Sequence, residues 1–375
     1  MRALPAGAWA GWTTAIAAYV LVAGCAIAAP LLVYSVTLAS FGAAHVLSEL
    51  RYVDRRFGRG LGTGRIGLMG LLLAGAASAR VLGVFQVVDG SLAIMLELSC
   101  VVVLAASAAD GSGPRSALAI GIAACLAIAT LVAPFDTVIS LSILHNLTPL
   151  AFLWEILPAR HRLLGMAMAG VAFIGMPLIV ATGIPRAALA GLGLIAPAID
   201  PLGAGPLARH LYVYVPAPLL SGASAIDLFT GAVVAQCAHY AAVIVVLPVL
   251  LARQDPKARG IVAWPSGLTF AALVALVSIA IFYRFGQEFT YTRALYGIAS
   301  SVHAWIEVPL IVIALTRAAQ PRSSTPVNAE ATLARAETSI DLPHDICVTQ
   351  PTTTASTAMT AVSANTTVAP YPRRG

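Results

Sequence analysis

Apolar residues run along this chain in stretches of about 20, separated by short polar segments. Twenty residues of α-helix rise about 30 Å, which matches the hydrocarbon core of a bilayer. The pattern therefore predicts an all-α fold, a polytopic bundle of about ten transmembrane helices. The predicted spans are 8–28, 31–52, 65–86, 91–109, 116–134, 137–157, 164–184, 225–252, 261–283 and 293–316.

Two segments depart from this pattern. Prolines repeatedly interrupt 187–222, so we expect an outer loop with an interfacial or re-entrant piece rather than a span. Beyond about residue 317 the chain is rich in Thr, Ala, Ser and Pro, and such a segment cannot bury enough apolar surface to fold. We therefore predict a transmembrane helical domain, 1–316, and a disordered cytoplasmic tail, 317–375.

Composition supports a membrane protein. Hydrophobic residues make up 59% of the chain and charged residues only 10%, with a mean hydropathy of +0.88. Soluble domains carry about 25% charged residues, so the lipid bilayer is the expected partner. The net charge of +6 comes almost wholly from arginine, and no basic groove with interleaved aromatic residues indicates nucleic-acid binding. Five cysteines without a CxxC motif argue against a disulfide framework, and no nucleotide-binding loop is present.

Basic residues gather on one side of the predicted bundle. The loop 51–65 holds five arginines, and the loops 110–115, 158–163 and 253–259 share its side if ten helices alternate. The positive-inside rule makes this side cytoplasmic and places both termini there. We expect a multi-pass protein of the cell membrane, such as a bacterial inner membrane.

Four of the seven histidines lie inside even-numbered spans, which run from outside to inside: His45, His145, His239 and His303. The last three lie about 18–20 Å along the helix from the cytoplasmic ends of their spans. His45 reaches the same layer only if its helix continues past Tyr52 to Phe57, with the intervening arginines extending to the interface. The sequence thus predicts a layer of four histidines near the middle of the bilayer.

Carboxylates accompany these histidines. The spacing HxxxE occurs twice, so Glu49 follows His45 and Glu307 follows His303 on the same helix face. Glu97 in the fourth span has a similar depth. Ionisable residues inside a membrane are costly and are functional candidates.

Several nearby residues have weaker or supporting roles. Glu155 lies ten residues beyond His145 and joins the layer only if Pro149 breaks the helix. Arg80 is a counter-ion for the carboxylates or, by a slight preference, extends to the outer face. Possible hydrogen-bond partners of the histidines are Asn146, Gln236 and Tyr240.

Imidazole and carboxylate groups with open positions suit non-haem iron, and also zinc or manganese. We interpret the four histidines with Glu49, Glu97 and Glu307 as candidate metal ligands, with iron favoured, and Glu49, Glu307 and Tyr240 as candidate catalytic residues. A single intramembrane histidine more often packs against a neighbouring helix. Four at matched depth favour a metal centre over this structural interpretation.

One histidine per helix, within HVLSELRY, LHNLTPL, QCAHY and VHAWIE, resembles the Brp/Blh family of membrane β-carotene-cleaving oxygenases. The resemblance covers the distribution of histidines over the spans, and it implies an iron-dependent oxygenase with His45, His145, His239 and His303 as ligands. The family's His-Gly-x-x-Asp signature is absent, because Val46-Leu47-Ser48-Glu49 follows His45. No HxxHH or HxxxH box of a membrane desaturase occurs.

The leading hypothesis is a metal-dependent membrane oxidoreductase or oxygenase acting on a lipid-soluble small molecule, such as an isoprenoid, a carotenoid or an acyl chain. A transporter or proton-coupled carrier is the main alternative, because buried His and Glu chains also relay protons. Haem held by two histidines and a purely structural membrane protein are further alternatives. The sequence identifies no electron donor.

Overall fold

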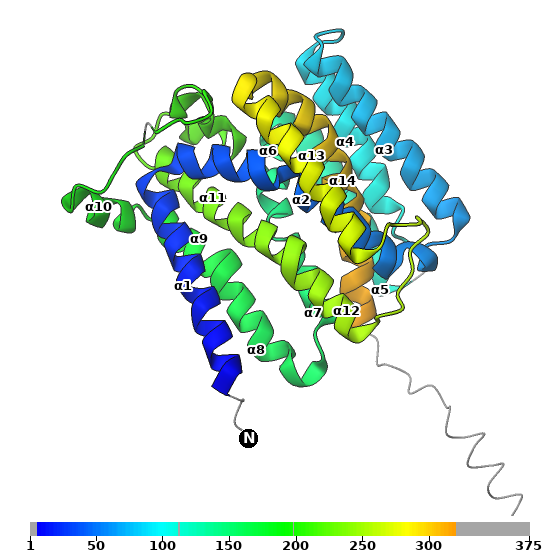
Figure 1. Cartoon of the computed structure of the whole chain (residues 1–375). Helices are drawn as coiled ribbons and strands as arrows, with labels where there is room; N and C mark the ends of the chain where they lie inside the picture. Colours follow the sequence, from blue (N-terminus) through cyan, green and yellow to red (C-terminus); the bar gives the residue numbers. More distant parts are fainter. Residues whose placement is uncertain (1–5, 112, 198, 320–375) are drawn as a thin grey trace, which may run out of the picture. The chain divides into compact units, whose positions relative to one another are not determined.

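The computed structural model describes residues 6–111, 113–197 and 199–319, and the regular structure in these ranges is helical without a strand (Figure 1). Most of the predicted tail, 320–375, lies outside the described residues. The α-helices are α1 Ala6–Ala28, α2 Pro30–Phe57, α3 Thr63–Val84, α4 Gly90–Ala106, α5 Pro114–Val132, α6 Pro134–His145, α7 Thr148–Ile156, α8 Ala159–Gly170, α9 Met176–Ala181, α10 Ile184–Gly191, α11 Ala225–Ala241, α12 Leu247–Gln254, α13 Gly267–Gln287 and α14 Phe289–Ala319.

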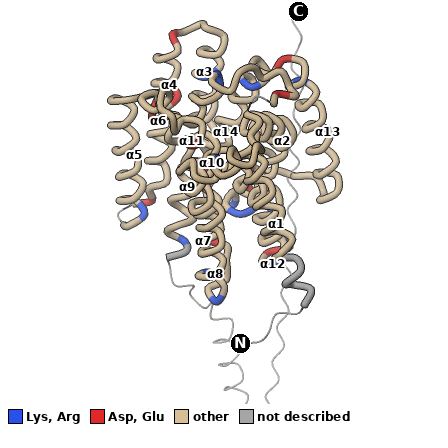
Figure 2. The backbone as a smooth tube through the Cα atoms, turned by 90° about the vertical axis from the view of Figure 1, so that its left-hand side faces the viewer, with Lys and Arg blue, Asp and Glu red and all other residues tan. Residues whose placement is uncertain are grey.

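Eight helical segments of the described chain are long and apolar enough to cross a membrane, and two further apolar helices, Thr13–Ala28 and Gly90–Ala106, are shorter. Each predicted span corresponds to one of these ten. Lys, Arg, Asp and Glu lie mainly towards the helix ends, as Figure 2 shows. An all-α bundle with membrane-length helices is therefore confirmed, whereas ten crossings and cytoplasmic termini stay predictions.

The helices divide into a buried centre and an exposed periphery. In the most apolar window of α2, 67% of the residues are buried, against 6% in α13. α13 packs on α2 and α14, and its outward side exposes Leu268, Leu276 and Ile279. Exposed apolar area of this kind suits contact with lipid. α2 and α14, which carry the two HxxxE sequences, lie inside this shell.

The predicted extension of the second helix is confirmed. α2 runs unbroken from Pro30 to Phe57. Its last turns are held by Arg55, whose Nε donates to the carbonyl of Ala258 at 3.0 Å, and by Arg56, which forms an ion pair with Glu155. His45 consequently lies twelve residues before the end of its helix, as the depth comparison requires.

Three predicted spans are interrupted in the structure. The span 137–157 divides into α6 and α7, with a break at Asn146 and Leu147 directly after His145. π-helical turns at Val171–Gly175 and Ala242–Val246 join α8 to α9 and α11 to α12. Pro177 and Pro248 follow these turns, and a proline without an N–H removes the helical bond that would close a regular turn. The second π-turn follows His239 closely, and π-turns inside α-helices occur frequently at functional sites.

The proline-rich segment forms no membrane-length helix within its described residues. α10 is followed by short 3₁₀ turns at Leu207–Arg209, Leu211–Val213 and Ala217–Leu219. This agrees with the predicted loop.

Candidate metal centre

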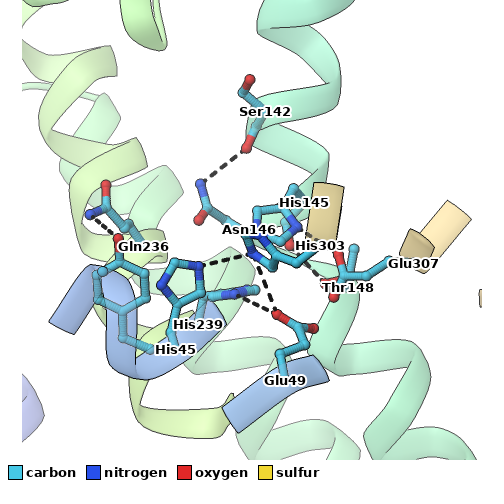
Figure 3. Close-up of polar contacts among 12 residues, drawn as sticks. His45, Glu49, Ser142, His145, Asn146, Thr148, Gln236, His239, His303 and Glu307 are labelled. Carbon is cyan, nitrogen blue, oxygen red and sulfur yellow. Dashed lines mark hydrogen bonds and ion pairs between the residues drawn. The ribbon is translucent and has the colours of Figure 1, made fainter. Parts of the chain in front are cut away.

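Four helices bring the predicted histidines together, as Figure 3 shows. The Nε2 atoms of His45 and His303 are 3.0 Å apart. The ring of His145 lies 4.5 Å from that of His239 and 4.8 Å from that of His303, centroid to centroid. The residues come from α2, α6, α11 and α14, so four distant parts of the sequence meet at one point.

Glu49 faces the same point. It lies one turn after His45 on α2, and its Oε2 atom is 3.5 Å from Nε2 of His239 and 3.8 Å from Nε2 of His303. Its side chain is fully buried, and neither oxygen has a hydrogen-bond partner among the described residues. A carboxylate in this position is costly unless a cation or a donor compensates it.

Unpartnered atoms are concentrated in this region. Both ring nitrogens of His239 and Nδ1 of His303 are buried without a hydrogen-bond partner in the described part of the chain. Buried polar atoms nearly always find a partner, so Nε2 of His239 and the two Glu49 oxygens, which lie beside each other, point to a missing one. The Nδ1 atoms of His239 and His303 lie on the opposite sides of their rings from the Nε2 atoms that face Glu49. Two donors held about 2.1 Å from one metal ion lie about 3.0–3.4 Å apart, close to the contacts seen here.

Two overlapping sets of side chains have donor atoms close enough for one ion. One set is His45, His145 and His239, and the other is Glu49, His145 and His303. The atoms within each set lie within 4.8 Å of one another. Since His145 belongs to both sets, the four histidines and Glu49 form one centre, which we call the histidine–glutamate cluster.

Glu307 supports the cluster from behind His145. Its Oε2 atom is 2.6 Å from Nδ1 of His145, and the Thr148 hydroxyl is 3.0 Å from its Oε1 atom. A carboxylate on one ring nitrogen fixes the tautomer and leaves the other nitrogen for a metal. The break after His145 is what places Thr148, at the start of α7, beside this pair.

Tyr240 and Gln236 lie beside the cluster on α11. The Tyr240 ring stacks on His45, with centroids 4.4 Å apart. Gln236 donates from Nε2 to the Tyr240 hydroxyl at 3.0 Å and accepts at Oε1 from the Tyr214 hydroxyl at 2.6 Å. The predicted partner Asn146 instead donates to the backbone carbonyl of Ser142 at 3.3 Å.

Two predicted carboxylates belong to other contacts. Glu97 receives Arg80 Nε at 2.9 and 3.0 Å and Trp305 Nε1 at 2.7 Å, and it belongs to neither metal-competent set. Arg80 is thus a counter-ion. Glu155 pairs with Arg56 near the end of α2, so the break in the helix does not bring it to the histidines.

Sequence reasoning missed Thr148, Trp305 and Tyr296. The Tyr296 hydroxyl donates to the carbonyl of Gly42 at 3.1 Å and lies 3.5 Å from Nδ1 of His45. Helical spacing offered a signal, because Tyr296 precedes His303 by two turns on α14. Thr148 also follows His145 by three residues, the distance of one turn.

A cavity of about 770 Å³ reaches the cluster and is lined in part by His45, His145, His303 and Tyr240. Its walls are mainly apolar, with contributions from α2, α3, α6 and α14. A pocket of this size is typical of sites for small molecules.

No protein-family model, curated protein or solved structure matches this chain. The resemblance to the Brp/Blh family therefore stays a prediction.

Proposed function

We propose that this protein is a metal-dependent membrane oxidoreductase acting on a lipid-soluble substrate that enters the cavity beside the histidine–glutamate cluster. The observation that carries the proposal is the convergence of four histidines and a buried carboxylate, with donor atoms that lack partners. A bound cation would satisfy Nε2 of His239 and the Glu49 oxygens, and it would offset the cost of burying Glu49.

The donor set supports iron more than other ions. Imidazole with carboxylate suits non-haem iron, and zinc or manganese are the alternatives. When bound, such a metal supplies the activation of dioxygen, the oxidant in this proposal. An isoprenoid, a carotenoid or another long apolar chain fits the apolar walls of the cavity.

The surrounding residues have assignable tasks. Glu307 and Thr148 orient His145, and Glu49 supplies a negative charge beside His239 and His303. The stacked Tyr240 ring restricts His45, and its hydroxyl is ordered by Gln236. Since Tyr240 also lines the cavity where a substrate would lie, it is the candidate for hydrogen bonding to the substrate.

Metal analysis tests the proposal directly. The purified protein is expected to retain about one transition-metal ion per chain by inductively coupled plasma mass spectrometry, and His145→Ala and His239→Ala to lose it. His161→Ala is the matched control, because His161 is exposed on α8. A protein without metal, together with an unchanged His145→Ala variant, contradicts the proposal. A Soret absorption band would assign haem instead.

A proton-coupled carrier is the second candidate, supported by the pair of half-buried His145 and buried Glu307 beside the unpartnered Glu49. Proteoliposome flux that depends on Glu49 or Glu307 but not on bound metal favours the carrier. Flux absent from a metal-loaded protein favours the enzyme.

A further inference from the structure

The cavity beside the histidine–glutamate cluster has a second, charged end. Besides the histidines, its lining includes Asp136 and Arg293. Asp136 precedes His145 by nine residues on α6, and Arg293 precedes His303 by ten on α14. At 1.5 Å per residue both charges lie about 14–15 Å along their helices from the cluster. The cavity therefore joins a polar end to the candidate metal centre.

Arg293 is held in place without a carboxylate. One terminal nitrogen donates to Nδ1 of His210 at 2.8 Å, and the other donates to the Tyr212 hydroxyl. Nε2 of His210 in turn donates to the carbonyl of Ala204 at 3.0 Å, so this imidazole is neutral and accepts at Nδ1. Among the described residues no carboxylate pairs with Arg293. Its guanidinium is oriented, yet its charge is not compensated.

Asp136 is the complementary case. Its Oδ1 atom is buried and has no hydrogen-bond partner among the residues that the structure describes. Elsewhere in the described chain, Arg80 is paired with Glu97 and Arg186 with Asp227. Asp136 and Arg293 line one cavity, and neither forms an ion pair with a side chain among the described residues.

We propose that this end of the cavity binds the head of a zwitterionic amphiphile, with an acidic group on Arg293 and an ammonium group on Asp136. The substrate class of the proposed oxidoreductase is then an apolar chain carrying such a head, and this step rests on the proposed function. The head anchors the molecule, and about 14 Å of apolar chain extends to the cluster. Arg recognises phosphate or carboxylate through its fork of donors, and complementary charges give specificity more than affinity.

Three lipids with the same lauroyl chain test the head. We would measure binding of lauroyl lysophosphatidylethanolamine, lauroyl lysophosphatidic acid and monolaurin to the full chain in maltoside micelles by native mass spectrometry. The wild type is expected to prefer the zwitterion to monolaurin about tenfold. Arg293→Gln should remove this preference, and Asp136→Asn should make the zwitterionic and acidic lipids equal. Arg284→Gln is the matched control, because Arg284 is exposed on α13 and does not line the cavity.

Equal binding of all three lipids to the wild type overturns the proposal, as does an Arg293→Gln variant that matches Arg284→Gln. Lysophosphatidic acid binding as tightly as the zwitterion overturns the role of Asp136. If Arg293→Gln fails to fold, Asp136→Asn and Arg293→Lys still test the site, since lysine keeps the charge but not the fork.

A bilayer lipid and a free amphiphile share this head. Binding of the zwitterionic lysolipid is compared in nanodiscs of phosphatidylethanolamine and of phosphatidylglycerol. Weaker binding in phosphatidylethanolamine assigns the site to a bilayer lipid, and equal binding in the two assigns it to a free molecule. Both results support the head site. The His145→Ala variant separates this inference from the proposed function. It should lose metal but keep the preference for the zwitterionic lipid, because Arg293 and Asp136 lie at the other end of the cavity from His145.

Discussion

Two buried glutamates in the same bundle have opposite environments. Glu97 is 2% exposed and accepts hydrogen bonds from Arg80 and Trp305, whereas Glu49 is fully buried and accepts none from the described residues. α14 contributes to both sites, with Trp305 at the first and His303 at the second. The fold can therefore satisfy a buried carboxylate where structure alone requires it. The unsatisfied Glu49 indicates a place that a ligand completes.

The largest expected effect is a difference in stability between these glutamates in metal-free protein. Glu97→Gln leaves Arg80 without its counter-charge and should lower the free energy of unfolding by about 3 kcal/mol, the low end for a buried pair because Arg80 is 26% exposed. Glu49→Gln removes a charge that has no partner and should be neutral or stabilising. Thermal unfolding in micelles with a chelator measures both. Equal losses would show that Glu49 is compensated within the protein.

Adding metal should reverse the effect of Glu49→Gln on stability relative to the wild type. An ion at 100 times its dissociation constant stabilises the native state by about 2.7 kcal/mol. We expect the wild type and Glu97→Gln to gain stability on adding Fe²⁺ or Zn²⁺, and His239→Ala to gain none. Glu49→Gln should gain less than the wild type. If His239→Ala responds as strongly as the wild type, the ion binds elsewhere.

Glu307 should have an intermediate effect, because it contacts a ligand rather than the ion. Loss of such a partner typically lowers metal affinity about 10–100-fold, and we expect this for Glu307→Gln. Thr148→Val should have a smaller effect in the same direction, since Glu307 keeps its bond to His145. Competition with a metallochromic chelator measures each constant. Glu155→Gln is the control. If Glu307→Gln binds metal as tightly as this control, Glu307 has a role in packing alone.

The sequence could predict the depth of each ionisable residue in the bundle, but not the rotation of each helix about its own axis. Apolar run lengths placed the four histidines in one layer, and that layer required α2 to reach Phe57, as it does. The same reasoning gave Glu97 a matching depth. Yet α4 packs mainly on α3 and α5, so its carboxylate meets Arg80 instead of the histidines. Rotation about a helix axis depends on its neighbours, and apolar runs carry little information about them.

Local breaks in the helices were equally hard to predict. Pro149 suggested a break that could bring Glu155 inward, and the chain does break just before it, at Asn146 and Leu147. The result is that Thr148 reaches Glu307, whereas Glu155 pairs with Arg56. Long-range side-chain partners decided both outcomes.

His210 provides the smallest and most specific test, because it is a buried histidine with both nitrogens bonded, unlike His239. Burial lowers the pKa of His210, with the Ala204 carbonyl opposing this and the nearby Arg293 charge adding to it. An unfolded histidine titrates near pH 6.5, so the unfolded state binds more protons just below that value. Stability from the neutral ring is therefore complete above about pH 6.5 and lost as the pH falls towards the lower folded pKa.

His210→Gln should remove this dependence, while the cluster histidines contribute equally to both proteins. The measurement is the difference in unfolding temperature between the wild type and His210→Gln, followed from about pH 8 to about pH 5. This difference should change in favour of the variant at low pH, because only the wild type loses the stability of a neutral ring at this position. A difference independent of pH would mean that folding does not lower the pKa of His210. A difference that changes in favour of the wild type at low pH would mean that the folded protein holds this ring protonated, and Arg293 would then need another partner.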